Sequence, residues 1–148
     1  MFYIGIDVSK DKHDCFCCND DLQPVFQFQF NNDSIGFKQL FEAIKSLDSP
    51  FDNIKIALEA TGHYSYNITS FILDNSLPLA IINPLHSNLF RKSLSLRKTK
   101  TDKVDACVLA RMLIAYPDLK FSTSLDDNDI ILSELKSLTR FRLSLVKD

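Results

Sequence analysis

The chain has 148 residues, of which 45% are hydrophobic and 24% are charged, and its formal net charge at pH 7 is −2. This composition is typical of a soluble globular domain with a real core, and it excludes disordered and fibrous proteins. No apolar run reaches the length of a membrane span, and the first residues lack the basic region and apolar core of a signal peptide, so we expect a cytoplasmic protein with no membrane contact.

Three segments near the start have the pattern of β-strands. Phe2–Val8 is almost wholly apolar, as expected of a central strand buried on both faces, and Val25–Phe30 alternates apolar residues with glutamine. Between them, Lys12–Cys18 holds neither glycine nor proline, which favours a strand. Three successive strands joined by short turns predict an antiparallel meander.

Asp7 lies at the end of the first of these strands. An aspartate in this place either faces a ligand, because open sheets place their sites at strand ends, or caps the turn SKDK that follows. Both interpretations stay open when this residue is taken alone.

The four cysteines do not have the spacing of a zinc site or a disulfide framework. Three of them crowd into the motif CFCC, and Cys107 stands far along the chain. In a strand, Cys18 faces away from Cys15 and Cys17, so a tetrahedral site would need distant ligands. We therefore expect buried free thiols.

A helix and a fourth strand follow the meander. Asn31–Ser34 supplies capping residues, and apolar residues recur at helical spacing as far as Leu47. Asn53–Glu59 then alternates as a strand does, and a strand reached by a helical crossover lies parallel to the first. Because parallel strands end at the same edge of a sheet, we expect Glu59 and Asp7 to come together.

The next segment predicts a helix, a short strand and a further helix. Leu79–Ile82 has the pattern of a fifth strand, and Pro84 suits the first turn of the helix after it. We expect that helix to turn Leu85, Leu89 and Phe90 inward. The helix before the fifth strand has these residues on its predicted inner face: Tyr64, Ile68, Phe71 and Ile72.

The stretch RKSLSLRKTKTDKVDACVLAR, residues 91–111, sets Asp102 and Asp105 three residues apart. Apolar residues at helical spacing follow (Val104, Val108, Leu109 and Met112). Positions i and i+3 share one face of a helix, so both carboxylates point the same way, which suits ligands of a divalent metal. The alternative is that Asp102 is only a helix-start residue favoured by the helix dipole, with Thr99 or Thr101 as the N-cap.

The same stretch concentrates positive charge. From residue 91 to residue 103, six cations stand against one carboxylate, a net charge of +5, while the rest of the chain carries −7. Such a patch fits a phosphate backbone that approaches beside the paired carboxylates, and a solvated polar loop is the alternative. We expect these residues to bind nucleic acid: Arg91, Lys92, Arg97, Lys98, Lys100 and Lys103.

Residues 123–148 differ in their sequence pattern from residues 1–122. A heptad-like stripe of apolar residues predicts a helix that leaves the compact domain and pairs with a partner (Ile131, Leu135, Leu138 and Leu145). We therefore expect a catalytic domain over residues 1–122 and, over residues 123–148, the start of a helical, coiled-coil linker to a missing C-terminal domain. A homo-oligomer would form through this helix.

Four motifs in this order resemble the DEDD transposases of bacterial insertion sequences, the group that includes the pilin-gene invertase and the bridge-RNA-guided recombinases. They are GIDVSKDKHD at the start, LEATGHY around Glu59, INPLHSNLFR after the fifth strand, and KTKTDKVDACVLARML. The resemblance implies an α/β, ribonuclease H-like fold similar to the Holliday-junction resolvase, with a mixed five-stranded sheet flanked by helices. The order of the expected elements agrees with this fold.

The resemblance also implies a catalytic tetrad that binds metal, made of Asp7, Glu59, Asp102 and Asp105. Hard oxygen ligands suit Mg²⁺, for which Mn²⁺ is a substitute, and two ions would stabilise the attacking and leaving oxygens of a phosphodiester. We expect Asp7 to bridge the ions, with Glu59 on one side and the paired aspartates on the other. The implied function is the N-terminal, metal-dependent catalytic domain of a DNA transposase or site-specific recombinase, with DNA as partner and a guide RNA as a further candidate.

Two other functions compete with this one. A nucleotide-binding ATPase half of the actin and sugar-kinase type also ends its first strand in aspartate, but it needs a glycine-rich phosphate loop and the chain has only three glycines. A non-catalytic nucleic-acid-binding or dimerisation module is the main alternative. His63 or Tyr64 either lines the substrate path or only packs.

Overall fold

The computed structural model describes residues 1–60, 62–95 and 105–122. Its five strands are β1 (Phe2–Asp7), β2 (Lys12–Asn19), β3 (Pro24–Asn31), β4 (Ile54–Glu59) and β5 (Leu79–Ile82). Its helices are α1 (Ser34–Lys45), α2 (Tyr66–Asp74), α3 (Pro84–Ser95) and α4 (Asp105–Ala115), with short 3-10 helices at Phe51–Asn53 and Gly62–Ser65. None of the helices in these ranges has the length and apolar character needed to cross a membrane.

The strands form one mixed sheet in the order β3-β2-β1-β4-β5. The first three strands pair antiparallel, which confirms the predicted meander, while β4 pairs parallel to both β1 and β5. In the β1–β4 ladder Ile6 is paired with Leu58. Asp7 and Glu59, the next residue of each strand, therefore lie side by side at the carboxyl edge of the sheet, as predicted.

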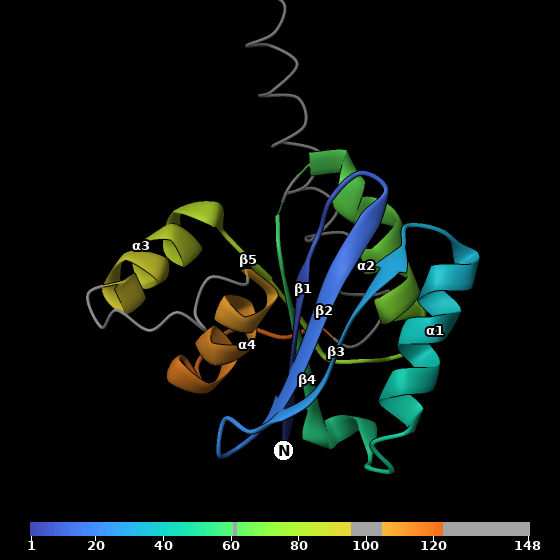
Figure 1. Cartoon of the computed structure of the whole chain (residues 1–148), viewed down its shortest axis with the longest axis horizontal. Helices are drawn as coiled ribbons and strands as arrows, with labels where there is room; N and C mark the ends of the chain where they lie inside the picture. The colour runs from blue at the N-terminus through green and yellow to red at the C-terminus, as the bar shows by residue number, and fades with distance from the viewer. Residues whose placement is uncertain (61, 96–104, 123–148) are drawn as a thin grey trace, which may run out of the picture.

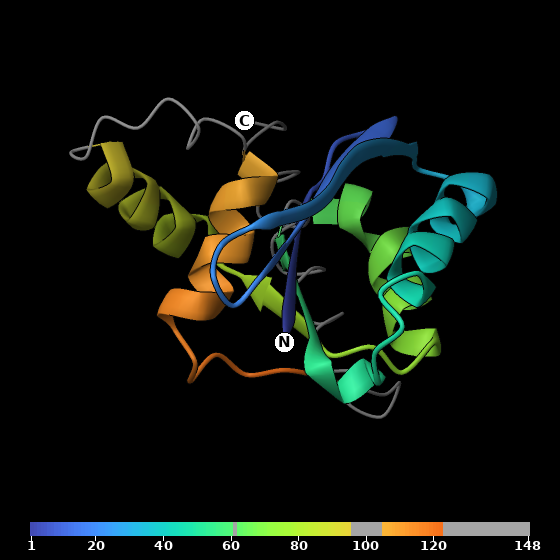
Figure 2. The same cartoon turned by 60° about the horizontal axis from the view of Figure 1, so that its bottom comes forward.

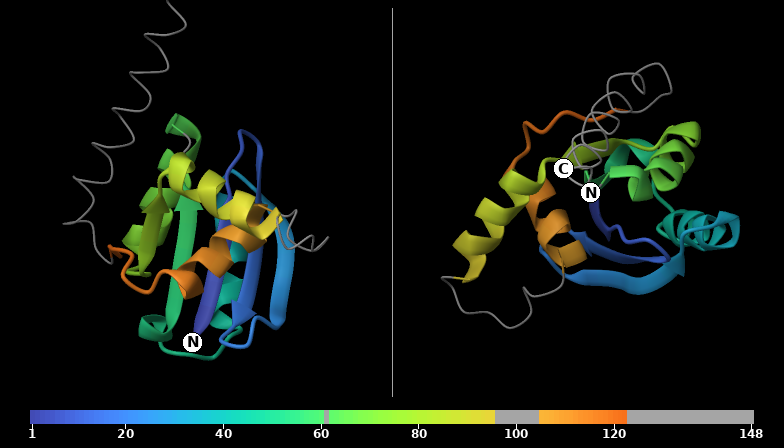
Figure 3. Two further views of the ribbon diagram at one scale, coloured as in Figure 1. Left: turned by 90° about the vertical axis from the view of Figure 1, so that its left-hand side faces the viewer. Right: turned by 90° about the horizontal axis from the view of Figure 1, so that it is seen from above.

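Helices cover the sheet on both faces (Figure 1). On one face, α1 and α2 pack against large aliphatic side chains of β1 and β4, in a cluster that includes Ile4, Ile6, Ile56 and Leu58. On the other face, α4 packs directly on β1, and α3 packs on α4 at a greater distance from the sheet (Figures 2 and 3). Because side chains alternate along a strand, Gly5, Asp7 and Glu59 belong to the face under α4.

The close approach of α4 to β1 depends on Gly5. A Cβ atom at this position would lie 1.9 Å from the carbonyl oxygen of Ala106 and 2.8 Å from the backbone nitrogen of Ala110. Both of those atoms are backbone, so no side chain can turn away to make room. The glycine thus lets the first turn of α4, and Asp105 with it, lie against the end of the central strand.

The predicted helices are largely confirmed. The side chain of Asp33 caps α1 by accepting a hydrogen bond from the backbone N–H of Gly36 at 2.8 Å, although the helix ends two residues before the predicted Leu47. Ile68 and Ile72 are fully buried in α2, as are Val108 and Met112 in α4, which agrees with their predicted inner faces. Tyr64 lies in the 3-10 helix that precedes α2 and packs against the core.

The prediction that Leu85 and Leu89 turn inward is wrong. These side chains are 73% and 65% exposed, whereas Leu94 of the same helix is buried and Phe90 packs against the cluster of α4. The reason is that α3 packs on α4 rather than on the sheet, so a narrower stripe of the helix is covered.

None of the four cysteines, all of which lie in the described ranges, forms a disulfide, and the predicted burial is confirmed for three of them, while Cys107 is only partly buried. Cys15, Cys17 and Cys18 are buried in β2, and burial raises the pKa of Cys17 to about 12 and that of Cys18 to about 11. These thiols are therefore neutral packing groups at physiological pH. The predicted division at residue 122 concerns residues 123–148, which lie outside the described ranges, and it stays a prediction.

Candidate metal centre

Three of the four predicted metal ligands converge at the carboxyl edge of the sheet. Asp7 ends β1, Glu59 ends β4, and Asp105 stands in the first turn of α4, which packs on β1. The three side chains thus come from three elements that are far apart in the sequence. Asp102, the fourth predicted ligand, lies outside the described residues.

The charge environment of Asp7 shows how close the acids are. Its pKa is raised from 3.8 to about 6, first by burial and then by neighbouring carboxylates, of which Asp105 acts most strongly, followed by Asp14 and Glu59. The guanidinium of Arg91 acts in the opposite direction and lowers this pKa. Asp7 therefore carries a proton for part of the time near pH 6, as expected where carboxylates gather without enough positive charge.

Asp14 is an acid near the site that the sequence did not single out. It lies opposite Asp7 in the antiparallel register of β1 and β2, and both side chains are partly buried. Directly opposed residues of an antiparallel pair place their side chains on the same face. The register of the predicted hairpin would have revealed this pair.

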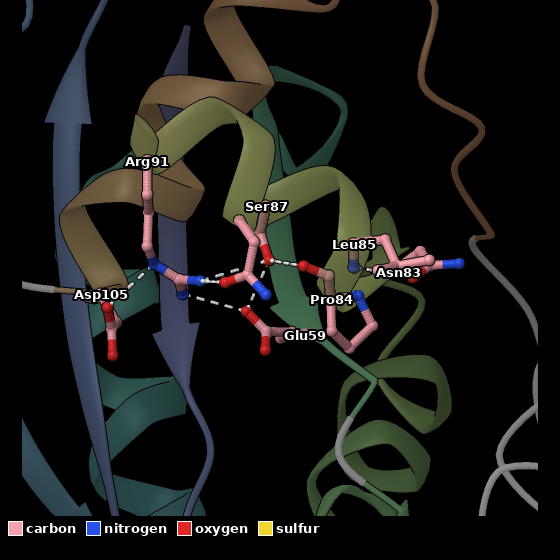
Figure 4. Close-up of polar contacts among 8 residues, drawn as sticks. Glu59, Asn83, Pro84, Leu85, Ser87, Arg91 and Asp105 are labelled. Atoms are coloured by element: carbon pink, nitrogen blue, oxygen red, sulfur yellow. Dashed lines mark hydrogen bonds and ion pairs between the residues drawn. The ribbon is translucent and has the colours of Figure 1, made fainter. Parts of the chain in front are cut away.

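Arg91 joins two of the predicted ligands. Its Nη2 donates to Oε2 of Glu59 at 3.0 Å, and its Nε donates to Oδ1 of Asp105 at 3.1 Å (Figure 4). The side chains of Arg91, Glu59 and Asp105 are 26%, 19% and 47% exposed, so the pair with Glu59 is the more enclosed. The sequence suggested Arg91 only as a phosphate contact, and its place between two carboxylates is new.

Ser87 holds the carboxylate of Glu59 from the same helix that carries Arg91. Its hydroxyl is fully buried and lies 2.8 Å from Oε2 of Glu59, to which it donates, and 3.1 Å from the carbonyl oxygen of Pro84. Oε2 of Glu59 thus accepts from both Ser87 and Arg91. Such supporting contacts fix the orientation of a carboxylate that binds metal.

The donor set suits a hard divalent cation. Carboxylate oxygens are the ligands that Mg²⁺ and Mn²⁺ prefer, and the pKa of Asp7 is raised first by burial and then by neighbouring negative charge, which a cation would neutralise. Within the described ranges, however, no three acidic, histidine or cysteine side chains are arranged to share one ion. The chemistry of the acids therefore fits, while the observed arrangement has a guanidinium between Glu59 and Asp105.

Of the residues predicted to bind nucleic acid, Arg91 alone takes part in the contacts described above. Lys92 is exposed on α3, next to Arg91. His63 is exposed in the 3-10 helix after β4, with its ring centroid 4.2 Å from that of the partly buried Tyr64. The remaining predicted nucleic-acid contacts lie outside the described residues: Arg97, Lys98, Lys100 and Lys103.

The chain matches known proteins both in sequence and in fold. The model of the IS110-type DEDD family, described as "Transposase", matches residues 4–148. The pilin gene-inverting proteins of Moraxella bovis and Moraxella lacunata are each 36% identical over 110 residues, which is 74% of this chain and 33% of each relative. The chain thus spans about a third of the length of these curated relatives.

Solved structures of Thermus thermophilus RuvC share the fold. The chain matches one of them with a TM-score of 0.56 and another, RuvC in complex with a Holliday junction substrate, with a TM-score of 0.54. Each match covers 82% of this chain and 99% or more of RuvC, at 10% sequence identity. At this identity the likeness concerns the fold alone, and it confirms the expected ribonuclease H-like architecture.

Proposed function

Because this chain belongs to the IS110-type DEDD transposase family, we propose that it is the N-terminal, metal-dependent catalytic domain of a DNA transposase or site-specific recombinase. The observation that carries the proposal is the convergence of Asp7, Glu59 and Asp105 at one edge of a ribonuclease H-like sheet. The proposed reaction is phosphodiester cleavage and strand transfer on DNA.

The proposed ligands are the four acids of the family motif. Asp7, whose pKa is influenced by both Asp105 and Glu59, is the proposed bridging ligand, and Glu59 would serve one ion while Asp105 and Asp102 would serve the other. When bound, two Mg²⁺ or Mn²⁺ ions supply positive charge next to the attacking and leaving oxygens of the phosphodiester. Asp7 must give up its proton to act as a ligand, while Ser87 keeps Glu59 in place.

DNA is the proposed partner, and the basic stretch would hold its backbone beside the acids. Lys92 lies on α3 beside the site, and the other cations follow along residues 97–103. Binding that depends on phosphate contacts weakens steeply with salt. The RuvC structure with a Holliday junction supports a branched DNA as the first substrate to try. A guide RNA and a homo-oligomer formed through residues 123–148 remain part of the proposal.

Cleavage of a labelled four-way DNA junction in Mg²⁺ or Mn²⁺ tests the proposed function. We expect cleavage by the native chain and a loss of at least about 100-fold in Glu59→Gln and Asp105→Asn, because each removes a negatively charged ligand. Glu42→Gln is the matched control, since Glu42 is an exposed acid of α1, on the other face of the sheet. This variant should cleave as the native chain does.

The outcomes separate the two candidate functions. Cleavage that survives in Glu59→Gln and Asp105→Asn contradicts the assignment of these acids. Binding to the junction without cleavage, indifferent to Mg²⁺ and to both substitutions, favours a non-catalytic nucleic-acid-binding module.

A further inference from the structure

The contacts of Arg91 place a cation inside the acid cluster formed by Asp7, Glu59 and Asp105. Figure 4 shows its guanidinium between Asp105 of α4 and Glu59 of β4, with a dashed contact to each. A third contact runs from Nη1 to Oδ1 of Asn88, on the same helix, at 2.8 Å. In the absence of DNA, an arginine that only binds phosphate would extend into solvent, whereas the Arg91 side chain is about three-quarters covered.

The two carboxylates that Arg91 contacts are both proposed metal ligands. A guanidinium and a divalent ion are attracted by the same negative charge, and they repel each other when they share it. Hydrogen bonds between ionised partners are stronger than neutral ones, so the pairs with Glu59 and Asp105 must be weakened before these oxygens can coordinate an ion. Although the three acids lie at the same edge of the sheet, no three acidic, histidine or cysteine side chains of the described residues are arranged to share one ion.

We infer that Arg91 and the divalent ion compete for Glu59 and Asp105, and that ion binding releases the guanidinium towards the phosphate backbone of DNA. The inference rests on the proposed function and adds an order of events to it. Arg91 holds the acids together until the ion arrives, and it then becomes a phosphate contact beside the site. Metal binding and DNA binding are thereby coupled through one side chain.

Asn88 can keep a hydrogen bond to Arg91 after the guanidinium leaves the carboxylates. Its Oδ1 accepts from Nη1 of Arg91 three residues further along α3, and this contact does not involve β4 or α4. Nη1 also lies 3.5 Å from the hydroxyl of Ser87 on the same helix, so the guanidinium can leave both carboxylates and keep partners on α3. Lys92, the next residue, is exposed and belongs to the same basic stretch.

Calorimetric titration of Mn²⁺ into the native chain and into Arg91→Met tests the competition. We expect Arg91→Met to bind Mn²⁺ about tenfold more tightly or better, because the ion no longer has to displace two charge-assisted pairs. Lys38→Met is the matched control, since Lys38 is an exposed cation of α1 on the other face of the sheet. Its affinity should stay within about twofold of the native value.

Unchanged or weaker Mn²⁺ binding in a folded Arg91→Met overturns the inference, and weaker binding shows that the arginine positions the ligands instead. If the native chain binds Mn²⁺ and Asp105→Asn does not, the proposed metal site stands whatever Arg91→Met does. If the native chain binds no Mn²⁺, the proposed metal site fails and the inference fails with it. The two failures are therefore distinguishable.

A second measurement follows Arg91 in the native chain. The Nε–H group of Arg91, which donates to Asp105, gives its own ¹H–¹⁵N signal, assigned by comparison with Arg91→Lys. On addition of diamagnetic Mg²⁺ we expect this signal to shift and to exchange faster with water, as the pair is lost. A signal that stays in place while the ion is bound contradicts release of the guanidinium.

Discussion

The two faces of the sheet are built from alternate residues of the same strands, and they differ in size and in charge. On the face towards α1 and α2, the strands β1 and β4 present large aliphatic side chains such as Ile4 and Ile6, which lie in a buried apolar core. Towards α4, the same strands present Tyr3 and Lys55 near their starts, Gly5 and Ala57 in the middle, and Asp7 and Glu59 at their ends. The large side chains bury apolar area, while the small ones let a helix come close enough to bring a third carboxylate to the edge.

Each face also holds a partly or fully buried titratable group with a shifted pKa, His13 on one and Asp7 on the other, and these two respond to acid in opposite directions. Burial lowers the pKa of His13 on the α1 face. Its ring meets Phe30 edge-on and lies parallel to that of Phe37, and its Nδ1 accepts a hydrogen bond from the backbone N–H of Ser9 at 3.2 Å. Burial and neighbouring charge raise the pKa of Asp7 on the α4 face. The face towards α1 and α2 therefore favours the neutral form of a base. On the face towards α4, the positive charge is too small to offset the burial of Asp7 and its neighbouring carboxylates.

Adding one methyl group to the α4 face should have the largest effect on stability. Gly5→Ala places a Cβ atom 1.9 Å from a backbone oxygen of α4, so we expect a loss of about 3 kcal/mol in the free energy of unfolding. Ile4→Val, which removes one methyl group from the opposite face, should cost about 1 kcal/mol. Urea denaturation measures both values, and equal losses would show that α4 can move away from β1.

Much of this comparison was predictable, and the unpredicted part has a physical cause. Alternation and the shared edge of parallel strands were enough to bring Asp7 and Glu59 together. The partner of Arg91 was not predictable, because an arginine in a basic stretch suits a phosphate and a carboxylate equally well. Asp14 required the register of the hairpin, and the exposure of Leu89 required knowing that α3 packs on another helix.

Neutralising Asp7 should stabilise the fold at neutral pH. Its folded pKa of about 6 lies above the value of 3.8 in an unfolded chain, so the folded state binds more protons between these values and stability falls as pH rises through this window. Asp7→Asn should gain about 1–2 kcal/mol at pH 7.5, with allowance for partial exposure, and nothing at pH 4.

Thermal unfolding across this pH range checks the prediction, with Asp21→Asn on the exposed β2–β3 turn as the control. A gain for Asp7→Asn that is the same at pH 4 and pH 7.5 would show that packing, rather than charge, causes it.

Replacing His13 should change how the free energy of unfolding responds to pH below about 6.5. Its folded pKa lies below the ordinary 6.5, so the unfolded chain binds the proton first and stability falls as pH drops below about 6.5. His13→Asn keeps an acceptor near Nδ1 but does not titrate, so its free energy of unfolding should fall less than that of the native chain between pH 6.5 and pH 5. Unfolding curves at these two pH values give the difference, and an unaltered slope would assign the acid response to other groups.

The exposed leucines of α3 should matter least for stability. Leu85→Gln and Leu89→Gln each remove a side chain that is mostly in water, so we expect changes below about 0.5 kcal/mol in the free energy of unfolding. Ile68→Val in the buried face of α2 should cost about 1 kcal/mol. Urea denaturation measures all three, and a larger loss at Leu89 would mean that this face of α3 is covered in the folded chain.

Iron-mediated cleavage of the backbone tests the central claim most directly, because it locates a bound ion along the chain. Fe²⁺ takes the place of Mg²⁺, and ascorbate with peroxide then generates radicals that cut the backbone near the ion. The account predicts cuts around Asp7, Glu59 and Asp105 that excess Mg²⁺ suppresses and that Glu59→Gln abolishes. Cuts confined to other segments, or cuts at these positions that persist in Glu59→Gln, would contradict a metal centre at this edge of the sheet.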